Sequence, residues 1–129
     1  MRYYPTFHEN VECFRIATSV AYVFKVSIDE MKSKTRQKRI VEARQYYFYV
    51  CKESSTLTYG KIAGYIKRDH ATGVYGAKKI KEQLAIYPDV QEKIDEIYSY
   101  LVRKGDEKLS VSLLHLEKAL HLYNKFLRQ

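Results

Sequence analysis

Residues 58–84 read TYGKIAGYIKRDHATGVYGAKKIKEQL, and this stretch decides the fold. Its apolar residues recur at helical spacing in two short blocks. They are Ile62, Ala63 and Ile66 in the first block and Val74, Ala77, Ile80 and Leu84 in the second. Thr58 can cap a first helix over residues 59–66, and residues 67–70 form a turn before a second helix over residues 71–84. Two short helices joined by a tight turn predict a helix-turn-helix layout.

The rest of the chain is also patterned as helix. Helices are predicted over residues 9–24, over a short segment that begins after Ser27, and over residues 38–53. Ser27 and Glu30 form the capping box of the short helix, and the polar stretch that follows it is a loop. A helix over residues 88–104 is predicted to end at Gly105, and a last helix covers residues 107–128. The chain is therefore predicted to be one compact all-α domain of six or seven helices.

Positive charge is concentrated in the middle of this chain. The whole sequence has a net charge of +8, but residues 31–83 hold 13 Lys/Arg against 4 Asp/Glu, a net charge of +9, and the remainder holds 10 against 11. A concentrated basic surface is typical of proteins that bind a polyanion. A basic face that is merely solvated is the alternative on charge alone.

Several classes of protein are excluded by composition. No apolar run approaches the roughly 20 residues of a membrane span. The N-terminus lacks the apolar region of a signal peptide, so we expect a cytoplasmic protein, associated with the nucleoid and not with membranes. Cys13 and Cys51 lack metal-binding or redox spacing and are predicted to be reduced core thiols. No metal site, cofactor or catalytic carboxylate pair is indicated, and we do not expect an enzyme.

The turn residues have the chemistry that reads base edges. A helix-turn-helix places the start of its second helix in the major groove. There Asp69 can accept a hydrogen bond from a cytosine amino group, His70 can bond to a base or pack on a thymine methyl, and Thr72 offers a hydroxyl and a methyl. Thr72, Tyr75 and Lys79 share the outer face of this helix. Alternatively, Asp69 only caps the helix, or does both, and His70 only completes the turn.

Basic residues around this helix can contact the phosphate backbone. The basic run that precedes it is Lys32, Lys34, Arg36, Lys38, Arg39 and Arg44. Arg36 lies in a loop that can reach a minor groove, where narrow A·T tracts attract guanidinium groups. Arg44 can equally lock the helices together by hydrogen bonds or touch DNA. The further candidate phosphate contacts are Lys52, Lys67, Lys78 and Lys79.

Four short runs in this order carry a family resemblance. They are Ile28-Asp29-Glu30-Met31-Lys32-Ser33-Lys34-Thr35-Arg36, Ala43-Arg44-Gln45, Arg68-Asp69-His70-Ala71-Thr72 and Ala77-Lys78-Lys79-Ile80. Over residues 20–84 the chain resembles the C-terminal DNA-binding domain of the bacterial replication initiator DnaA. The resemblance implies a compact helical fold of the TrpR and DnaA C-terminal type over residues 1–86.

In that family the domain binds a short duplex element, the DnaA box. The resemblance implies that Arg36 is the minor-groove arginine and that base-reading positions follow Arg68. These positions are Asp69, His70, Ala71 and Thr72. By the same resemblance the residues near the phosphate backbone are Arg44, Gln45, Lys52 and Thr58.

The chain departs from the family in several places. It has no G-x-x-x-x-G-K-[ST] phosphate loop, so we expect a domain that stands alone, without the AAA+ module or a bound nucleotide. Lys67 stands where the family usually has glycine, in a turn one residue shorter. Gly73 and Gly76 are interior glycines that each cost about 1 kcal/mol against alanine, so we expect a loosened second helix. Residues 87–129 have no counterpart and are predicted to be two helices packed on the domain.

We expect this chain to bind double-stranded DNA with a preference for sequence. We also expect it to be a replication or transcription regulator of a phage or mobile element. The segment Gly73-Val74-Tyr75-Gly76 also matches the G-x-x-G loop of RNA-binding KH domains, but a KH domain needs a three-stranded sheet. A protein-interaction module is the other alternative. Such a module would bind its partner through a stripe of leucine residues. The same stripe could instead pack within the chain or form a homodimer. That stripe is Leu109, Leu113, Leu116, Leu120 and Leu127.

Overall fold

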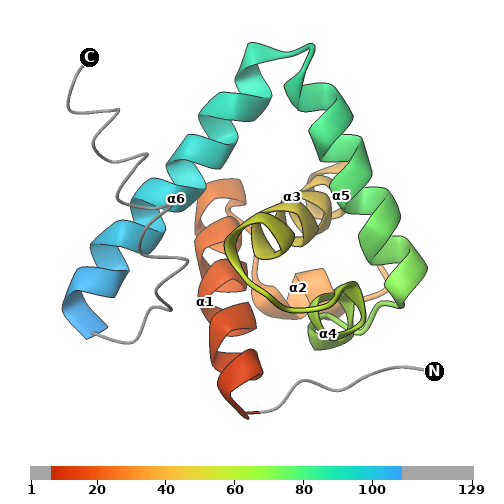
Figure 1. Ribbon diagram of the computed structural model, residues 1–129. Coiled ribbons are helices and arrows are strands. Elements are labelled where there is room, and N and C mark those ends of the chain that lie inside the picture. Colours follow the sequence, from red (N-terminus) through yellow and green to blue (C-terminus); the bar gives the residue numbers. More distant parts are fainter. Residues whose placement is uncertain (1–6, 109–129) are drawn as a thin grey trace.

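The computed structural model describes residues 7–108, which form six helices (Figure 1). In chain order these are α1 (Phe7–Phe24), α2 (Ile28–Lys32), α3 (Lys38–Ser54), α4 (Tyr59–Tyr65), α5 (His70–Leu84) and α6 (Pro88–Lys108). Helix α3 lies at the centre, with α1, α4 and α5 packed around it, and α6 runs along α1 (Figure 1). The described residues contain no strand, and the all-α prediction is confirmed.

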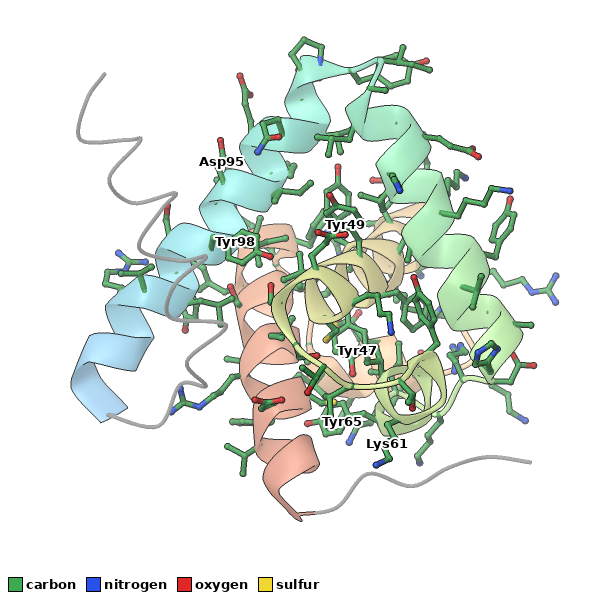
Figure 2. All side chains as sticks on the ribbon, in the orientation of Figure 1. Tyr47, Tyr49, Lys61, Tyr65, Asp95 and Tyr98 are labelled. Atoms are coloured by element: carbon green, nitrogen blue, oxygen red, sulfur yellow. The ribbon has the colours of Figure 1, made fainter. Side chains whose placement is uncertain are left out.

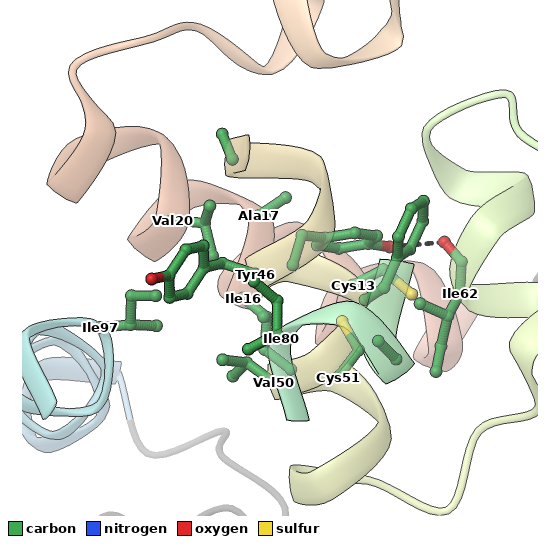
Figure 3. Close-up of a cluster of buried hydrophobic side chains, with 14 of the residues drawn as sticks. Cys13, Ile16, Ala17, Val20, Tyr46, Val50, Cys51, Ile62, Ile80 and Ile97 are labelled. Atoms are coloured by element: carbon green, nitrogen blue, oxygen red, sulfur yellow. Dashed lines mark hydrogen bonds between the residues drawn. The ribbon is translucent and has the colours of Figure 1, made fainter. Parts of the chain in front are cut away.

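The hydrophobic core includes two rings of α3, those of Tyr47 and Phe48, which are fully buried. Figure 3 shows part of this core, with Ile16 of α1, Ile62 of α4 and Ile80 of α5 among its members. The Tyr47 hydroxyl donates a hydrogen bond to the Ile62 carbonyl oxygen at 2.7 Å and so ties α3 to α4. Tyr47 also lies against Tyr65 of α4, with the ring centroids 6.4 Å apart (Figure 2). Helix α4 has only seven residues, so these tertiary contacts stabilise it more than its own backbone bonds do.

The two cysteines belong to the same core. Cys13 and Cys51 are both completely buried, and neither forms a disulfide. Burial raises the pKa of the Cys51 thiol well above its usual value, because a thiolate would lose its hydration there. The prediction of buried core thiols is therefore confirmed.

Helix α6 packs on α1 through apolar residues and buried polar contacts. Ile94 and Ile97 are buried, and the Ser19 hydroxyl of α1 donates a hydrogen bond to the Ile97 carbonyl oxygen at 2.6 Å. The hydroxyls of Ser54 and Tyr98 are hydrogen-bonded to each other, which links α3 to α6. Among the described helices, none is long and apolar enough to cross a membrane.

Local signals placed most helix boundaries well. The predicted capping box is present, because the Ser27 hydroxyl accepts from the Glu30 N–H at 3.0 Å and the Glu30 carboxylate accepts from the Ser27 N–H at 2.9 Å. The prediction that Gly105 ends a helix is wrong, since α6 continues to Lys108. One interior glycine weakens a helix by about 1 kcal/mol, which alone does not end it. The leucine stripe lies outside the described residues.

Two glycines let α5 approach α3 and α4 closely. Gly73 and Gly76 are both buried on the inner side of α5. A Cβ atom on Gly76 would lie 2.6 Å from Cδ2 of Phe48, and one on Gly73 would lie 3.3 Å from Cβ of Ala63. In the structure α5 is one continuous helix, and a loosened α5 stays a prediction. The glycines stand where the neighbouring helices leave little or no room for a side chain.

Substituting Gly76 with alanine tests this close packing. The added methyl group gains about 1 kcal/mol of helix propensity, but it collides with the buried Phe48 ring. We expect Gly76→Ala to lower the free energy of unfolding in urea by about 1–3 kcal/mol, the usual range for overpacking a core.

Gly73→Ala is the matched control, because its methyl group meets only a tight contact with Ala63. It should change the free energy of unfolding by less than about 1 kcal/mol. Equal effects of the two substitutions would contradict the packing explanation.

Candidate nucleic-acid interface

The turn between α4 and α5 is built around a left-handed residue. Lys67 has φ = 60°, and its N–H donates to the Gly64 carbonyl oxygen at 3.0 Å. The Arg68 N–H donates to the Ala63 carbonyl oxygen at 2.9 Å. These two bonds form a Schellman motif, whose left-handed position favours glycine. Lys67 therefore occupies a strained position, and the turn places its side chain in solvent.

Asp69 is the N-cap of α5. Its backbone is extended, and its carboxylate accepts a hydrogen bond from the Thr72 N–H at 2.9 Å. The cap starts the helix at His70, one residue earlier than predicted. Residues 69–72 are all exposed to solvent, as is Tyr75 one turn further on. The capping alternative for Asp69 is confirmed, and its base-reading role stays a prediction.

Arg44 holds the basic loop of residues 33–37 in place. The Arg44 guanidinium donates to the carbonyl oxygens of Met31 at 2.8 Å, Thr35 at 2.8 Å and Ser33 at 2.6 Å. It also reaches the Glu30 carbonyl oxygen at 3.2 Å. Burial, and then the positive charge of Arg68, lower the pKa of Arg44. Only 6% of Arg44 is exposed.

Two predicted phosphate contacts involve side chains that are largely buried. The Arg44 guanidinium donates hydrogen bonds to four carbonyl oxygens, which confirms that Arg44 locks the helices together. Gln45 is only 8% exposed and packs beneath α5, where its Cγ lies 3.4 Å from the position of a Cβ on Gly76. A phosphate contact of Arg44 or Gln45 stays a prediction.

Arg68 joins the basic loop to the turn before α5. Its guanidinium donates to the carbonyl oxygen of Ser33, which Arg44 also uses, and to those of Ile66 and Lys67 at 3.3 and 3.2 Å. The loop that carries Lys34 and Arg36 is therefore fastened beside the start of α5. Both of these side chains are exposed.

The opposite flank of the turn is formed by the start of α4. Thr58 caps α4 by accepting from the Lys61 N–H at 3.4 Å. The Lys52 ammonium group donates to the Leu57 carbonyl oxygen at 3.3 Å and lies 4.8 Å from the centroid of the Tyr59 ring. The start of α5 is thus connected to the basic loop through Arg68 and to Lys52 through the Tyr59 ring.

Most of the predicted site residues are accessible to a partner. On the side of α5 that faces away from α3, side chains project into solvent (Figure 2). The exposed members of the predicted set are Lys34, Arg36, Lys38, Arg39, Lys52, Thr58, Lys67, Asp69, His70, Ala71, Thr72 and Tyr75, and the partly exposed ones are Arg68 and Lys79.

These positive charges are little neutralised within the molecule. Lys38 forms an exposed ion pair with Glu42 at 4.0 Å, which is too weak to matter for stability. Lys34, Arg36 and Arg39 form no ion pair with any residue that the structure describes. The positive potential of this surface is therefore available to an anionic partner.

A family model described as the bacterial DnaA protein helix-turn-helix matches residues 14–80, just over half of the chain. The chain belongs to this family. It is 37% identical over 95 residues to the chromosomal replication initiator protein DnaA of Treponema denticola, covering 71% of this chain and 20% of that protein. The DnaA protein of Corynebacterium jeikeium is 34% identical over 86 residues, covering 63% of this chain and 15% of that protein.

The DnaA protein of Leifsonia xyli is 36% identical over 87 residues, covering 64% of this chain and 18% of that protein. The chain thus spans about a fifth or less of the curated relatives that it matches. The residues that match the DnaA helix-turn-helix model include the basic loop, the turn and most of α5. Helix α6 lies beyond them.

Sequence reasoning missed one residue at the centre of this DnaA-like surface. Tyr59 was not among the predicted site residues, yet its ring contacts both Lys52 and His70. The one available signal was an aromatic residue directly after the N-cap of α4. That signal is weak, since a pattern in one helix does not show which side chains of other helices it will meet.

Replacing Arg44 with leucine separates its locking role from phosphate binding. The substitution leaves several carbonyl oxygens of the loop without a donor, so we expect the free energy of unfolding to fall by about 2–4 kcal/mol. We also expect faster amide exchange in residues 33–37. Arg39→Leu is the control for an exposed arginine of the same helix and should change stability by less than about 0.5 kcal/mol. Unchanged stability of Arg44→Leu would contradict the lock.

Proposed function

We propose that this chain binds double-stranded DNA with a preference for a DnaA-box-like sequence. The observation that carries the proposal is the fastening of the basic loop to the start of α5 by Arg44 and Arg68. Because both parts belong to one rigid unit, Arg36 in a minor groove and the first turn of α5 in the adjacent major groove can engage one duplex together. Membership in the DnaA helix-turn-helix family supports this arrangement.

Affinity comes from the exposed basic side chains. Lysines and arginines that neutralise phosphates release condensed counterions, so binding through them weakens steeply with salt. The residues that we assign to phosphate contacts are Lys34, Lys38, Arg39, Lys52, Lys67 and Lys79. The hydroxyl of Thr58 and the N-terminus of α5 add neutral donors for the same purpose.

Sequence preference comes from a few short side chains. His70, Ala71 and Thr72 begin α5 and are exposed, so they can approach base edges in a major groove. Asp69 can accept from a cytosine while it caps the helix, since a carboxylate has several acceptor positions. Arg36 reads the width of the minor groove.

The wider role that we propose is regulation of DNA replication or transcription at the bacterial nucleoid. In this role the chain acts as a binding protein rather than an enzyme, without a nucleotide or metal cofactor. Its origin in a phage or mobile element stays a prediction.

A protein-interaction module is the second candidate function. Helix α1 exposes two large aromatic side chains on one side, Phe14 at 50% and Tyr22 at 60%. Such a face can bind a protein partner or a second copy of this chain, and Tyr22 within it already stacks on Tyr100 of α6. Binding through this face would depend little on salt.

The first experiment measures duplex binding by fluorescence anisotropy. A DnaA-box duplex and a scrambled duplex are titrated at several salt concentrations. We expect tighter binding to the box and, for both duplexes, a steep fall in affinity with salt. Equal affinity for the two duplexes would remove the sequence preference, and no binding to either would favour the protein-interaction module.

Two substitutions then test the minor-groove contact and the base-reading contact separately. We expect Arg36→Ala to weaken binding and to relax the preference at one end of the box, and His70→Ala to lower the preference about tenfold, the value of a base contact, while binding to scrambled DNA is retained. Arg103→Ala removes the same charge from α6 and is the control. The site assignment is wrong if both site variants bind every duplex as the parent does.

A further inference from the structure

Tyr59 occupies the junction of three helices. It is the first residue of α4, directly after the N-cap Thr58. The Lys52 ammonium group of α3 lies 4.8 Å from the centroid of its ring. The His70 ring of α5 meets it edge-on, with the centroids 5.9 Å apart and the ring planes at 84°. The Tyr59 ring therefore contacts both a phosphate-binding candidate and a base-reading candidate.

The backbone of α5 leaves room for this ring. A Cβ atom on Gly73 would lie 3.6 Å from Cδ1 of Tyr59 and 3.7 Å from its carbonyl oxygen. Because residue 73 follows residue 70 by nearly one helical turn, the ring lies along the first turn of α5. Tyr59 is half-buried there and cannot swing freely.

His70 depends on this neighbour for its orientation. The imidazole is exposed, and its ring packs edge-on against the Tyr59 ring. An exposed histidine without such a contact samples several rotamers, whereas a base edge accepts a hydrogen bond from a narrow range of directions. Edge-to-face packing of two rings restricts the imidazole to few orientations.

We infer that Tyr59 is a positioning residue, which orients His70 for base reading and so determines sequence preference without touching a base. The inference rests on the proposed function. The Lys52 ammonium group also contacts the ring, and the ring lies close to the backbone of α5 at Gly73. Removing the ring should release His70. Among the phosphate-binding side chains it removes a contact only of Lys52, which keeps its hydrogen bond to the Leu57 carbonyl oxygen.

The contact is tested first in the free protein. NMR signals of the His70 ring protons, identified by their absence in His70→Ala, report the ring current of a neighbouring aromatic side chain. We expect Tyr59→Leu to shift these signals and Tyr59→Phe, which keeps the ring, to leave them near the parent positions. Unshifted signals in Tyr59→Leu would overturn the inference, whatever the protein does with DNA.

The consequence for preference is tested with the two duplexes of the anisotropy experiment. We expect Tyr59→Leu to lower the ratio of box affinity to scrambled affinity about fivefold or more, with the salt slope unchanged. Tyr59→Phe should keep the parent ratio. In the His70→Ala background, Tyr59→Leu should cause no further loss of sequence preference. The two residues act through the same base contact, so their effects are not additive.

The outcomes separate the two proposals. An unchanged ratio in Tyr59→Leu, or an equal loss with and without His70, overturns the positioning role while duplex binding stands. A parent protein without any preference overturns both. Thermal unfolding checks that each variant folds, and Tyr59→Met, whose flexible side chain fills irregular gaps, replaces the leucine variant if that one does not.

Discussion

The buried guanidinium of Arg44 is the interaction on which the proposed binding surface depends. Helix α2 has five residues and cannot satisfy its own last carbonyl groups. Arg44 donates to two of these, on Glu30 and Met31, and to two more in the loop that follows. A buried charge is tolerated only when its donors are paired, so the guanidinium and the loop stabilise each other. A loop without an apolar face thereby acquires a defined position.

A second constraint is the close packing of α5. Intrinsic propensity disfavours two glycines in a 15-residue helix, yet Gly73 and Gly76 face Ala63 and Phe48 at distances that leave little or no room for a side chain. Tertiary packing therefore outweighs local preference on the inner side of α5. On its outer side the Asp69 cap supplies the start of the helix. The helix is thus held from within and presents its first turn outward.

The sequence predicted what depends on local pattern. Helical spacing and the Ser27 and Asp69 caps are short-range signals, and the all-α fold follows from them. The roles of individual residues depended on contacts between helices. Arg44 had two possible roles until its carbonyl partners were known, and Tyr59 drew no attention because its neighbours come from α3 and α5. Gly105 was misread because a glycine weakens a helix without ending it.

The proposed contacts fall into two structural groups that differ in freedom of movement. The phosphate-binding side chains are long, exposed lysines and arginines, which keep their electrostatic attraction when they move by an ångström or two. The base-reading side chains are short and lie on a capped first turn that Arg68 and Tyr59 support. Hydrogen bonds to base edges are directional, so they lose most of their discrimination when the donor or acceptor moves. Base reading therefore requires a rigid start of α5. Phosphate binding does not require rigid side chains in the basic loop. At the start of α5, the Arg68 hydrogen bonds, the Asp69 cap and the Tyr59 ring contact supply this rigidity.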